Sequence, residues 1–423
     1  MNIAVLGSGG REHSICFALK KSKKIKHLFC IPGNAGTATI ATNINTDISN
    51  FEKINQIIIE NKIDLIIVGP EQPLADGIVD FFKKKNVKIF GPEKFAAQLE
   101  GSKHFTKIIC KENDIPTAKF GFFDNYLLAQ KFINKLNVPI VVKADGLASG
   151  KGVYICDTKN KALKATKKII SGKFKSSSKV LLEEYLNGEE MSYFIIADEN
   201  NYKYFGSAQD HKRVGKNDIG PNTGGMGAYS PSAIINKNLE KKIIKKIIEP
   251  TLLYFKKKGH SYKGFLYAGL MIVKNEPFLI EYNVRMGDPE CQTILTRLNT
   301  DFLEIINATL TNKLSSLNIM WKKQKSICIV VCANGYPEKY KKNDEIKKLK
   351  NLNLKKNNFI FHAGTYIKDN KIFSNGGRVF NALSVSDKLL NARKKALNLI
   401  KKIGWKKGFY RNDIGWRAIN KKK

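Results

Sequence analysis

The first hundred residues alternate short, mostly apolar runs with segments of helical pattern. The runs that predict strands are 3–6, 27–31, 64–68 and 87–90. Strands without a polar face are buried on both sides, which is typical of a parallel sheet covered by helices. After the third run, one helix is predicted from the apolar residues Leu74, Ile78, Val79 and Phe82. The sequence therefore predicts an α/β, doubly wound N-terminal domain.

Loops rich in glycine and polar residues follow three of these strands, at 7–13, 32–37 and 69–74. Ligands of parallel sheets bind beyond the carboxyl ends of the strands, so these loops predict a binding site. The first loop brings backbone N–H groups to the start of a helix, which suits an anion. It lacks the last glycine of the Gly-x-Gly-x-x-Gly dinucleotide pattern, because position 12 is Glu, and a nicotinamide dehydrogenase is disfavoured. A tight turn without a ligand is the alternative.

The pattern changes near residue 102, where closely spaced strands with short turns indicate an antiparallel sheet. A third unit begins with the apolar run at 326–334. It contains a helix that we expect to begin with Ser386 as its N-cap and to end at Gly404. The predicted domains are residues 1–101, residues 102–315 with a lid lobe at about 120–190, and residues 326–423.

The net charge of +36 invites a nucleic-acid-binding interpretation. The lysines are dispersed over nearly every predicted helix and loop, however, and codon bias in an A/T-rich genome explains an excess of Lys, Asn and Ile. The charge still attracts small anions such as phosphates. Seven cysteines without a Cys-x-x-Cys pair indicate reduced thiols. Without a signal peptide or a membrane-spanning run, the chain is expected to be cytoplasmic.

Two segments of the middle unit suit a nucleotide. The hairpin at 143–153 holds three glycines and two lysines, so its backbone can close over a triphosphate while the lysines neutralise charge. It is not a Walker A loop, because the Gly-Lys-[Ser/Thr] ending and the following helix are missing. The stretch Glu-Glu-Tyr-Leu at 183–186, followed by Glu190, offers backbone groups to adenine and a carboxylate to ribose. Taken alone, that stretch fits an acidic, solvated turn better.

Glu281, Asn283 and Arg285 alternate at the end of a predicted strand and therefore share one face. Carboxylate and amide oxygens suit Mg²⁺, which takes its remaining ligands from water and substrate phosphates. Arg285 would stabilise a developing acyl or phosphoryl charge. A surface ion pair is the alternative. The polar, glycine-rich stretch at 209–229 fits a binding loop, or a disordered linker if composition alone is considered.

Together these segments resemble the phosphoribosylamine–glycine ligases, or glycinamide ribonucleotide synthetases, a family of ATP-grasp enzymes. The resemblance extends over the whole chain. Its motifs are Gly9-Gly10-Arg11-Glu12-His13, Pro32-Gly33-Asn34-Ala35-Gly36-Thr37, Val68-Gly69-Pro70-Glu71, the segments 98–103, 143–152, 209–213 and 220–230, Gly287-Asp288-Pro289-Glu290, His362-Ala363-Gly364-Thr365, the segment 375–379 and Asp413-Ile414-Gly415-Trp416-Arg417. Singly several of these are weak, but their order along the chain is specific to that family.

The resemblance implies a doubly wound pre-ATP-grasp domain, a two-lobed ATP-grasp fold and a small mixed α/β C-terminal domain. It implies that glycine is ligated to 5-phosphoribosylamine, giving glycinamide ribonucleotide, ADP and phosphate in de novo purine synthesis. ATP would convert the unreactive carboxylate to glycyl phosphate, whose carbonyl the sugar amine attacks. The implied cofactors are ATP and Mg²⁺ or Mn²⁺. A monomer without nucleic-acid or membrane partners is expected.

The resemblance also implies the site residues. Those expected to bind ATP are Lys103, Lys143, Glu183, Glu184, Tyr185, Leu186 and Glu190. Glu281 and Asn283 are expected to hold the metal. Asp210 and Arg285 are expected to pair with the ammonium and carboxylate of glycine, and they are the expected catalytic residues together with Lys143. Those expected to surround phosphoribosylamine are Gly9, Gly10, Asn34, Gly36, Thr37, Glu71, Gly364 and Thr365.

Two alternatives stay open at the level of sequence. Another ATP-grasp ligase, such as a carboxylase, would share Lys143 and Glu281 but lack the loops at 9–13 and 362–365. A nucleic-acid-binding protein would gather its positive charge in a stripe, bind DNA in a salt-sensitive way and turn over no nucleotide.

Overall fold

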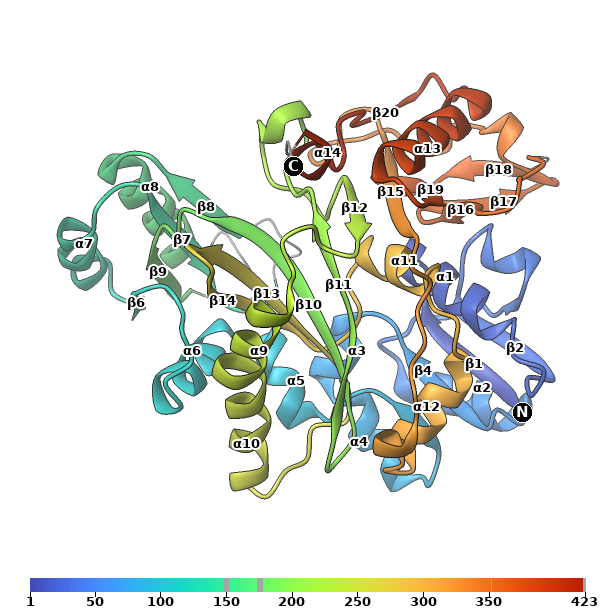
Figure 1. Ribbon diagram of the computed structural model, residues 1–423, viewed down its shortest axis with the longest axis horizontal. Helices are drawn as coiled ribbons and strands as arrows, with labels where there is room; N and C mark the ends of the chain where they lie inside the picture. Colours follow the sequence, from blue (N-terminus) through green and yellow to red (C-terminus); the bar gives the residue numbers. More distant parts are fainter. Residues whose placement is uncertain (148–151, 173–177, 351, 421–423) are drawn as a thin grey trace.

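The computed structural model describes residues 1–147, 152–172, 178–350 and 352–420 (Figure 1). Its N-terminal sheet has the strand order β3-β2-β1-β4-β5, with parallel neighbours throughout. The strands are β1 (Asn2–Gly7), β2 (His27–Pro32), β3 (Thr42–Asn43), β4 (Leu65–Val68) and β5 (Lys88–Phe90). The predicted doubly wound parallel sheet is confirmed. β3 was not predicted, because two residues are too short to show a pattern.

The helices of this domain differ from the prediction at one point. They are α1 (Gly10–Leu19), α2 (Phe51–Glu60), α3 (Glu71–Asp76), α4 (Ile78–Lys84) and α5 (Lys94–Gly101). The single helix expected through Leu74 and Phe82 is wrong, because Gly77 separates α3 from α4. Gly77 has a φ of +95°, a left-handed conformation that commonly ends a helix. The apolar residues on both sides of the break are buried, which is why their spacing suggested one helix.

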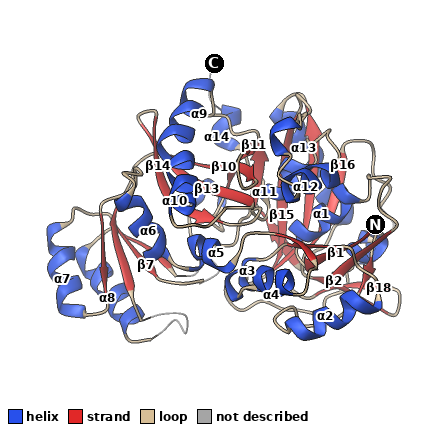
Figure 2. Ribbon diagram, turned by 90° about the horizontal axis from the view of Figure 1, so that it is seen from below, coloured by secondary structure: helices blue, strands red, loops and turns tan. Residues whose placement is uncertain are grey.

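A lid lobe stands at one end of the molecule (Figures 1 and 2). It is an antiparallel sheet with the order β6-β9-β7-β8, against which two helices pack. Its elements are β6 (Phe120–Phe123), α7 (Tyr126–Lys135), β7 (Ile140–Ala144), β8 (Val153–Cys156), α8 (Lys159–Ile170) and β9 (Val180–Glu184), and α6 (Lys103–Glu112) precedes them. Ala129, Ile140 and Leu182 belong to a hydrophobic core that the lobe does not share with the rest. The lobe is thus a separate packing unit.

The central sheet continues into the C-terminal strands, with the order β14-β13-β10-β11-β12-β15-β19-β16 and β20 paired with β15. Antiparallel pairing of β12 with β15 joins the middle and C-terminal parts. The strands are β10 (Glu189–Ala197), β11 (Tyr202–Asp210), β12 (Gly227–Ser230), β13 (Gly264–Val273), β14 (Glu276–Asn283), β15 (Lys325–Ala333), β16 (Asn358–His362), β19 (Arg378–Ser386) and β20 (Gly408–Tyr410), and β17 (Thr365–Lys368) pairs with β18 (Lys371–Ser374). The helices are α9 (Lys237–Ile243), α10 (Glu249–Lys257), α11 (Glu290–Leu295), α12 (Phe302–Leu310), α13 (Leu389–Ile403) and α14 (Trp416–Asn420).

The start of α13 differs from its prediction. Ser386 is not an N-cap, because β19 continues through it and pairs it with Lys325. The helix begins only after Lys388. Its end is as predicted, since Gly404 follows the last turn with a φ of +61°.

Two cores hold the N-terminal sheet against the central sheet. Ala4 and Leu6 of β1 share one core with Tyr193 of β10, whereas Ile3 and Val5 share another with Phe194. Successive residues of a strand point to opposite faces, so both faces of β1 are used in this packing. The loops after the N-terminal strands are therefore fixed relative to the central sheet.

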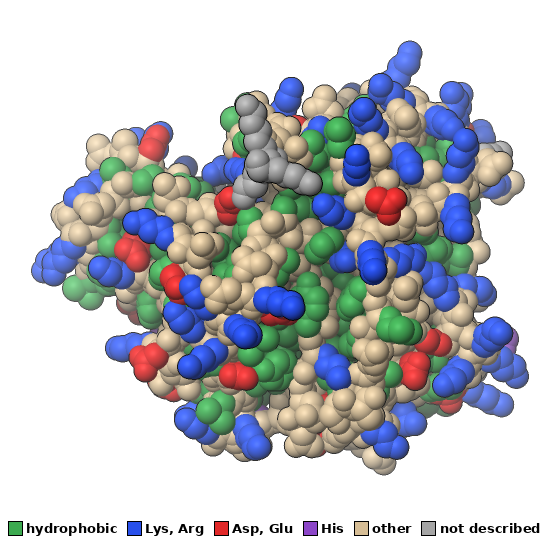
Figure 3. Space-filling view, in the orientation of Figure 1, with side chains coloured by type: hydrophobic (Ala, Val, Ile, Leu, Met, Phe, Trp, Pro, Cys, Tyr) green, Lys and Arg blue, Asp and Glu red, His purple; other side chains and the backbone are tan. Residues whose placement is uncertain are grey.

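The surface offers no concentrated basic stripe on the face shown in Figure 3. Lysine and arginine side chains are scattered over that face, with Asp and Glu among them. On this face, the distribution gives no support to the nucleic-acid-binding alternative. The cysteines are buried and free. In the part of the chain that the structure describes, no helix is both long and apolar enough to cross a bilayer.

Candidate active site

A cleft of about 660 Å³ opens between the lid lobe and the central sheet. The predicted residues that line it are Glu71, Lys143, Glu183, Glu184, Tyr185, Leu186, Glu190, Asp210, Glu281, Asn283 and Arg285. Three of these, Glu281, Asn283 and Arg285, face the same space as Lys143 of the hairpin. The structure thus brings residues far apart in the sequence into one site.

One end of the cleft has apolar walls. Residues 183–186 run along this end, and the walls are formed by Val141, Val153, Ile155, Met271 and Leu279. Apolar walls beside accessible backbone groups suit a heteroaromatic ring. The solvated acidic turn that the sequence favoured is wrong for Glu183, whose exposed fraction is only 3%.

Lysines gather beside this end. Lys143 Nζ lies 2.5 Å from Glu183 Oε2, and Lys107 Nζ contacts the other carboxylate oxygen, Oε1. Burial alone would raise the pKa of Glu183, but Lys143 and Lys107 hold it below its usual range. Lys103 Nζ donates to the carbonyl of Gly146 at 2.9 Å, so this predicted residue contacts the hairpin, and its charged neighbours include Glu281 and Lys143 of the cleft. Burial lowers the pKa of Lys103.

Hard oxygen donors occupy the middle of the cleft. Lys212 Nζ lies 3.5 Å from Glu281 Oε1 and also contacts Glu190 Oε1. Burial would raise the pKa of Glu281, but Lys212, Lys143 and Lys103 together lower it, so its carboxylate is charged. Asn283 supplies an amide oxygen on the same wall. This donor set fits Mg²⁺.

Asp210 lies at the end of β11 in acidic surroundings. Burial raises its pKa well above the usual range, the ammonium group of Lys212 opposes that shift, and Glu290 adds to it. Glu290 Oε1 accepts a hydrogen bond from Tyr267 Oη at 3.1 Å. Buried carboxylates of this kind gain most from an incoming cation such as an ammonium group.

Arg285 is held between two carboxylates at the far end of the cleft. Its Nη2 lies 2.6 Å from Glu100 Oε1, and its Nε donates to Glu71 Oε2 at 3.1 Å. The charge of Arg285 lowers the pKa of Glu71 to about 2, against the effect of burial. Burial raises the pKa of Glu100 to about 7, although Arg285 opposes this shift.

The remaining predicted residues form a second cluster, where the N-terminal loops meet the C-terminal strands. Asn34 organises it: its Nδ2 donates to the carbonyl groups of Ser8 (2.8 Å) and His362 (3.0 Å), and its Oδ1 accepts from the backbone N–H of Gly36 (2.8 Å). The backbone N–H of Ala35 donates to the Thr365 carbonyl at 3.3 Å. The members of this cluster are Gly9, Gly10, Asn34, Gly36, Thr37, Gly364 and Thr365.

Close packing explains three of its glycines. A Cβ on Gly10 would lie 2.2 Å from Asn381 Nδ2, and one on Gly36 would lie 2.2 Å from the His13 ring. At Gly364 it would meet the backbone of Gly376 at 2.5 Å. These contacts are far inside van der Waals distance, so the junction requires glycine at each position whatever it binds.

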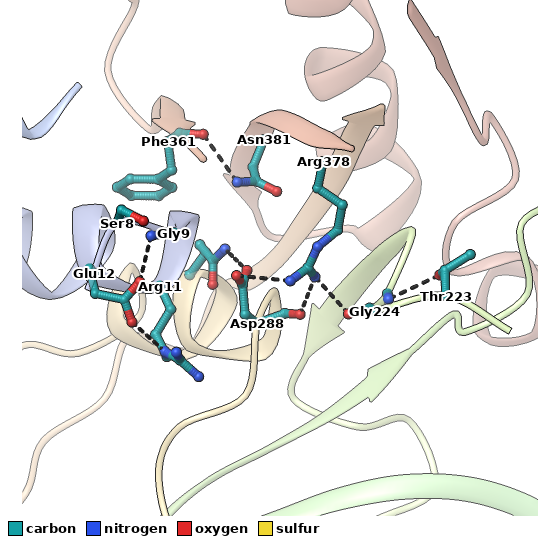
Figure 4. Close-up of polar contacts among 12 residues, drawn as sticks. Ser8, Gly9, Arg11, Glu12, Thr223, Gly224, Asp288, Phe361, Arg378 and Asn381 are labelled. Atoms are coloured by element: carbon teal, nitrogen blue, oxygen red, sulfur yellow. Dashed lines mark hydrogen bonds and ion pairs between the residues drawn. The ribbon is translucent and has the colours of Figure 1, made fainter. Parts of the chain in front are cut away.

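Asp288 and Arg378 connect this cluster to the cleft, which both side chains line (Figure 4). Arg378 Nη2 donates to Asp288 Oδ2 at 3.1 Å, and its Nη1 donates to the Gly224 carbonyl at 2.6 Å. On the other side, Glu12 Oε2 accepts from the backbone N–H of Gly9 at 2.6 Å. A Cβ on Gly9 would lie 3.2 Å from Asp288 Oδ2, so the N-terminal loop and Arg378 of the C-terminal unit both approach residue 288.

A C-terminal segment holds the loop after β11 in place. Asp218 accepts from Arg411 at 2.7 Å and pairs with Arg417 at 2.9 Å. His211 Nε2 accepts from the backbone N–H of Gly415 at 3.0 Å. Asp218 and its neighbour Asn217 both have left-handed backbone, with φ of +59° and +58°, which costs non-glycine residues energy. The contacts from 411–417 compensate for this strain.

Sequence reasoning missed several residues of the site. Lys107 lies one helical turn after Lys103, a spacing that places both on one face of α6. Glu100 and Arg378 stand inside recognised motifs but were given no role, and Lys212 was quoted only as part of a loop. Of the hairpin predicted to cover a triphosphate, 148–151 lie outside the described residues, as do 173–177 of the lysine- and serine-rich turn at 171–179.

Comparison with known proteins finds matches over almost all of the chain. Residues 1–100 match the N domain, residues 101–291 the ATP-grasp (A) domain and residues 326–417 the C domain of phosphoribosylglycinamide synthetase. A phosphoribosylamine–glycine ligase of Brucella melitensis biotype 1 is 42% identical over 424 residues, which cover 100% of this chain and 99% of that protein.

Solved structures agree with these matches. The crystal structure of phosphoribosylamine–glycine ligase from Thermotoga maritima has a TM-score of 0.86 at 34% identity, covering 98% of this chain and 100% of that one. The biotin carboxylase domain of Hydrogenobacter thermophilus 2-oxoglutarate carboxylase, in complex with MgADP, ADP and bicarbonate, has a TM-score of 0.72 at 14% identity, covering 99% and 97%. The latter likeness shows a shared fold.

Proposed function

This chain belongs to the phosphoribosylglycinamide synthetase family, and we propose that its cleft joins the carboxylate of glycine to the amine of 5-phosphoribosylamine. The reaction uses ATP and gives glycinamide ribonucleotide, ADP and phosphate in purine synthesis. The ATP-grasp fold predicted from the sequence is confirmed. The carboxylase alternative rests on a likeness of fold alone.

One observation carries the proposal. A single cleft joins a lysine-lined end with apolar walls to an end that holds the guanidinium group of Arg285, and it is also lined by the Asp210 carboxyl group, which an incoming ammonium group would ionise. The first, the nucleotide end, suits a nucleoside triphosphate, and the second, the arginine end, suits a small zwitterion such as glycine. The metal donors Glu281 and Asn283 lie between the two ends, where a terminal phosphate would meet a carboxylate.

The nucleotide would lie with adenine between the apolar walls. Backbone groups at 183–186 would hydrogen-bond the ring, and Glu190 would accept from the ribose hydroxyls. Lys143 and Lys103 would neutralise the phosphates, supported by their position beside the hairpin. In this arrangement Glu184 acts mainly on its own lobe, since its Oε1 accepts from the backbone N–H of Lys119 at 2.9 Å.

Mg²⁺ or Mn²⁺ bound at Glu281 and Asn283 would neutralise the phosphates during phosphoryl transfer. The charged state of Glu281 supports this assignment, because an anionic oxygen is a strong ligand for a hard cation. Glu281 also contacts Lys212, so that ammonium group competes with the metal for the same carboxylate.

Glycine would bind with its carboxylate toward Arg285 and its ammonium toward Asp210. Transfer of the γ-phosphoryl group forms a bond from a glycine oxygen to phosphorus and releases ADP. The amine of phosphoribosylamine then bonds to the carbonyl carbon, phosphate leaves, and the nitrogen loses a proton. Arg285 would stabilise the negative charge that develops on the oxygens in both steps.

Phosphoribosylamine would approach from the cluster around Asn34, whose members include Gly9, Gly10, Gly36, Thr37, Gly364 and Thr365. Glu71 lies at the boundary, since it lines the cleft and pairs with Arg285. The connection through Asp288 supports this direction of approach. We also propose that the chain acts as a cytoplasmic monomer and that its domains divide at 101–102 and between 315 and 326.

An ADP-release assay tests the function. Phosphoribosylamine would be generated in the assay, and glycine, alanine and bicarbonate would be compared as acids. We expect ADP release that depends on both glycine and phosphoribosylamine. Turnover with bicarbonate and without phosphoribosylamine would favour the carboxylase alternative.

A further inference from the structure

Lys107 of α6 is buried beside the nucleotide end but has no place in the proposed chemistry. Its exposed fraction is 2%. Its Nζ contacts Glu183 Oε1 and Thr117 Oγ1, and it lies 5.3 Å from the centroid of the Phe120 ring. Among the residues that the structure describes, Lys143 lines the cleft and Lys107 does not. Lys107 therefore reaches a bound nucleotide only through other side chains.

Glu183 is the connection between the two lysines. One carboxylate oxygen contacts Lys107, and the other lies 2.5 Å from Lys143 Nζ. The exposed fractions of all three side chains are 6% or less, so water screens these charges poorly. The charges of both lysines keep Glu183 ionised in spite of its burial.

The charge of this group depends on Lys107. Lys143 and Glu183 alone would form a neutral pair, and Lys143 would then have little attraction left for phosphates. With Lys107 the group carries one net positive charge, and the cleft-facing member is Lys143. A buried carboxylate with only one cationic partner would also draw Lys143 toward itself and away from the cleft.

We propose that Lys107 is a positioning residue for the nucleotide: it balances Glu183, so that the charge of Lys143 is available to the phosphates of a nucleoside triphosphate. This inference rests on the proposed function, in which Lys143 contacts those phosphates. Lys107 would thus act on the nucleotide through its charge, from a position outside the cleft lining.

An alternative interpretation is that Lys107 is only a structural anchor, which fixes α6 to β9. The two interpretations predict different results for one double variant. Lys107→Met removes a positive charge, and Glu183→Gln removes the negative charge that Lys107 balances. The double variant therefore keeps the net charge of the native group with two residues of similar size. If Lys107 is only an anchor, the second change removes one more buried contact, so the KM for ATP should not recover.

The experiment measures KM and kcat for ATP at saturating glycine and phosphoribosylamine, and the unfolding temperature of each variant. For Lys107→Met we expect the KM for ATP to rise by about 10- to 100-fold, the range for a lost charged hydrogen bond. The KM for glycine should stay within about 3-fold of the native value. Lys111→Met, an exposed lysine one turn further along α6, is the matched control and should leave both values unchanged.

In Lys107→Met/Glu183→Gln we expect the KM for ATP to return to within about 5-fold of the native value, even if the unfolding temperature falls. A folded double variant whose KM equals or exceeds that of Lys107→Met overturns the proposal. If Lys107→Met does not fold, Lys107→Arg keeps the charge and replaces it in the comparison; it should bind ATP nearly as the native protein does, and a rise as large as that expected for Lys107→Met overturns the proposal.

Lys143→Met separates this inference from the function on which it rests. If that variant binds ATP normally, the assignment of Lys143 to the phosphates fails, and the inference about Lys107 falls with it. If Lys143→Met loses ATP binding but the double variant shows no recovery, only the inference about Lys107 is wrong.

Discussion

The two ends of the cleft are built with opposite charge arrangements. At the nucleotide end one carboxylate, Glu183, lies between Lys107 and Lys143. At the other end one guanidinium group, Arg285, lies between Glu71 and Glu100. The first arrangement leaves a surplus positive charge for a polyanion. In the second arrangement, two N–H groups of Arg285 are paired with protein carboxylates, which fixes the plane of the guanidinium group. A fixed plane suits a small substrate that must be oriented.

The two ends also differ in how they respond to pH. Glu183 stays ionised because two lysines outweigh its burial. The carboxylates on Arg285 diverge: the pKa of Glu71 falls to about 2 through the charge of Arg285, and that of Glu100 rises to about 7 through burial. Near neutrality, therefore, the nucleotide end keeps a fixed charge while Glu100 gains or loses a proton.

The largest effect is expected at Glu281, which lies between the two ends. Glu281→Gln keeps the size of the side chain but removes the charged metal ligand, so turnover should fall by at least about 100-fold. Steady-state ADP release measures it. Glu276→Gln, on the same strand but paired with Lys242 and Lys246 away from the cleft, is the control and should keep native activity. Native-like turnover in Glu281→Gln would remove the metal assignment.

Arg285→Lys removes the planar group that fixes the geometry of the arginine end. A lysine keeps the positive charge but cannot pair with two carboxylates through a planar group. We expect kcat/KM for glycine to fall by roughly 10- to 100-fold, with the KM for ATP changed by less than about 3-fold. Steady-state kinetics with each substrate varied in turn measures both.

Arg297→Lys is the matched control for that variant, because Arg297 is also buried but donates to the carbonyl groups of Gln324 and Lys322. It should lower stability without a selective effect on glycine. Equal losses for ATP and glycine in Arg285→Lys would show that the two ends do not act separately.

Glu100→Gln sharpens the difference in pH response. Deprotonation of Glu100 adds a negative charge beside Arg285, so the native KM for glycine should rise as pH increases through about 7. The variant cannot titrate there, so its KM for glycine should stay flat from pH 6 to 8. Glu71→Gln is the contrast: Glu71 itself does not titrate near neutrality, so the step should persist, but it should move to lower pH because the charge of Glu71 helps to raise the pKa of Glu100.

Stability provides an independent readout of the same group. The folded-state pKa of Glu100, about 7, lies above its ordinary value of 4.5. Its contribution to stability is therefore complete below pH 4.5 and is lost as pH rises through 7. Relative to the native protein, Glu100→Gln should gain stability between pH 5 and 8, by up to about 3 kcal/mol. Parallel stability curves for the two proteins would contradict the assigned pKa.

The sequence could predict elements whose signal is local. Apolar runs such as 64–68 identified the parallel sheet, and the alternation of Glu281, Asn283 and Arg285 placed three side chains on one wall. A local break such as Gly77 was missed, because glycine in a helical pattern does not by itself reveal a left-handed φ. Ser386 failed for a related reason, since only its pairing with Lys325 shows that the strand continues.

Pairs formed by distant segments could not be predicted. The sequence of α6 does not indicate that Lys107 contacts a carboxylate of β9. The sequence of α5 likewise does not indicate that Glu100 pairs with an arginine that follows β14. These partners are set by the packing of whole lobes. Family resemblance supplied the residues on the cleft surface, whereas the charges behind them came only from the structure.

The smallest effect is expected where the C-terminal segment supports the nucleotide end. Arg411 donates to Asp218 and pairs with Asp413, and this holds the loop that presents Lys212 to Glu190. Arg411→Ala should raise the KM for ATP by roughly 2- to 10-fold, since one supporting ion pair is lost while Arg417 still contacts Asp218.

Arg393→Ala is the control for that variant, because Arg393 donates at 3.4 Å and 3.5 Å to the carbonyl groups of Asp413 and Ile414 without touching the loop. It should leave the KM for ATP unchanged. A selective rise in the KM for glycine in Arg411→Ala would contradict this expectation and would mean that the C-terminal segment supports the arginine end of the cleft instead.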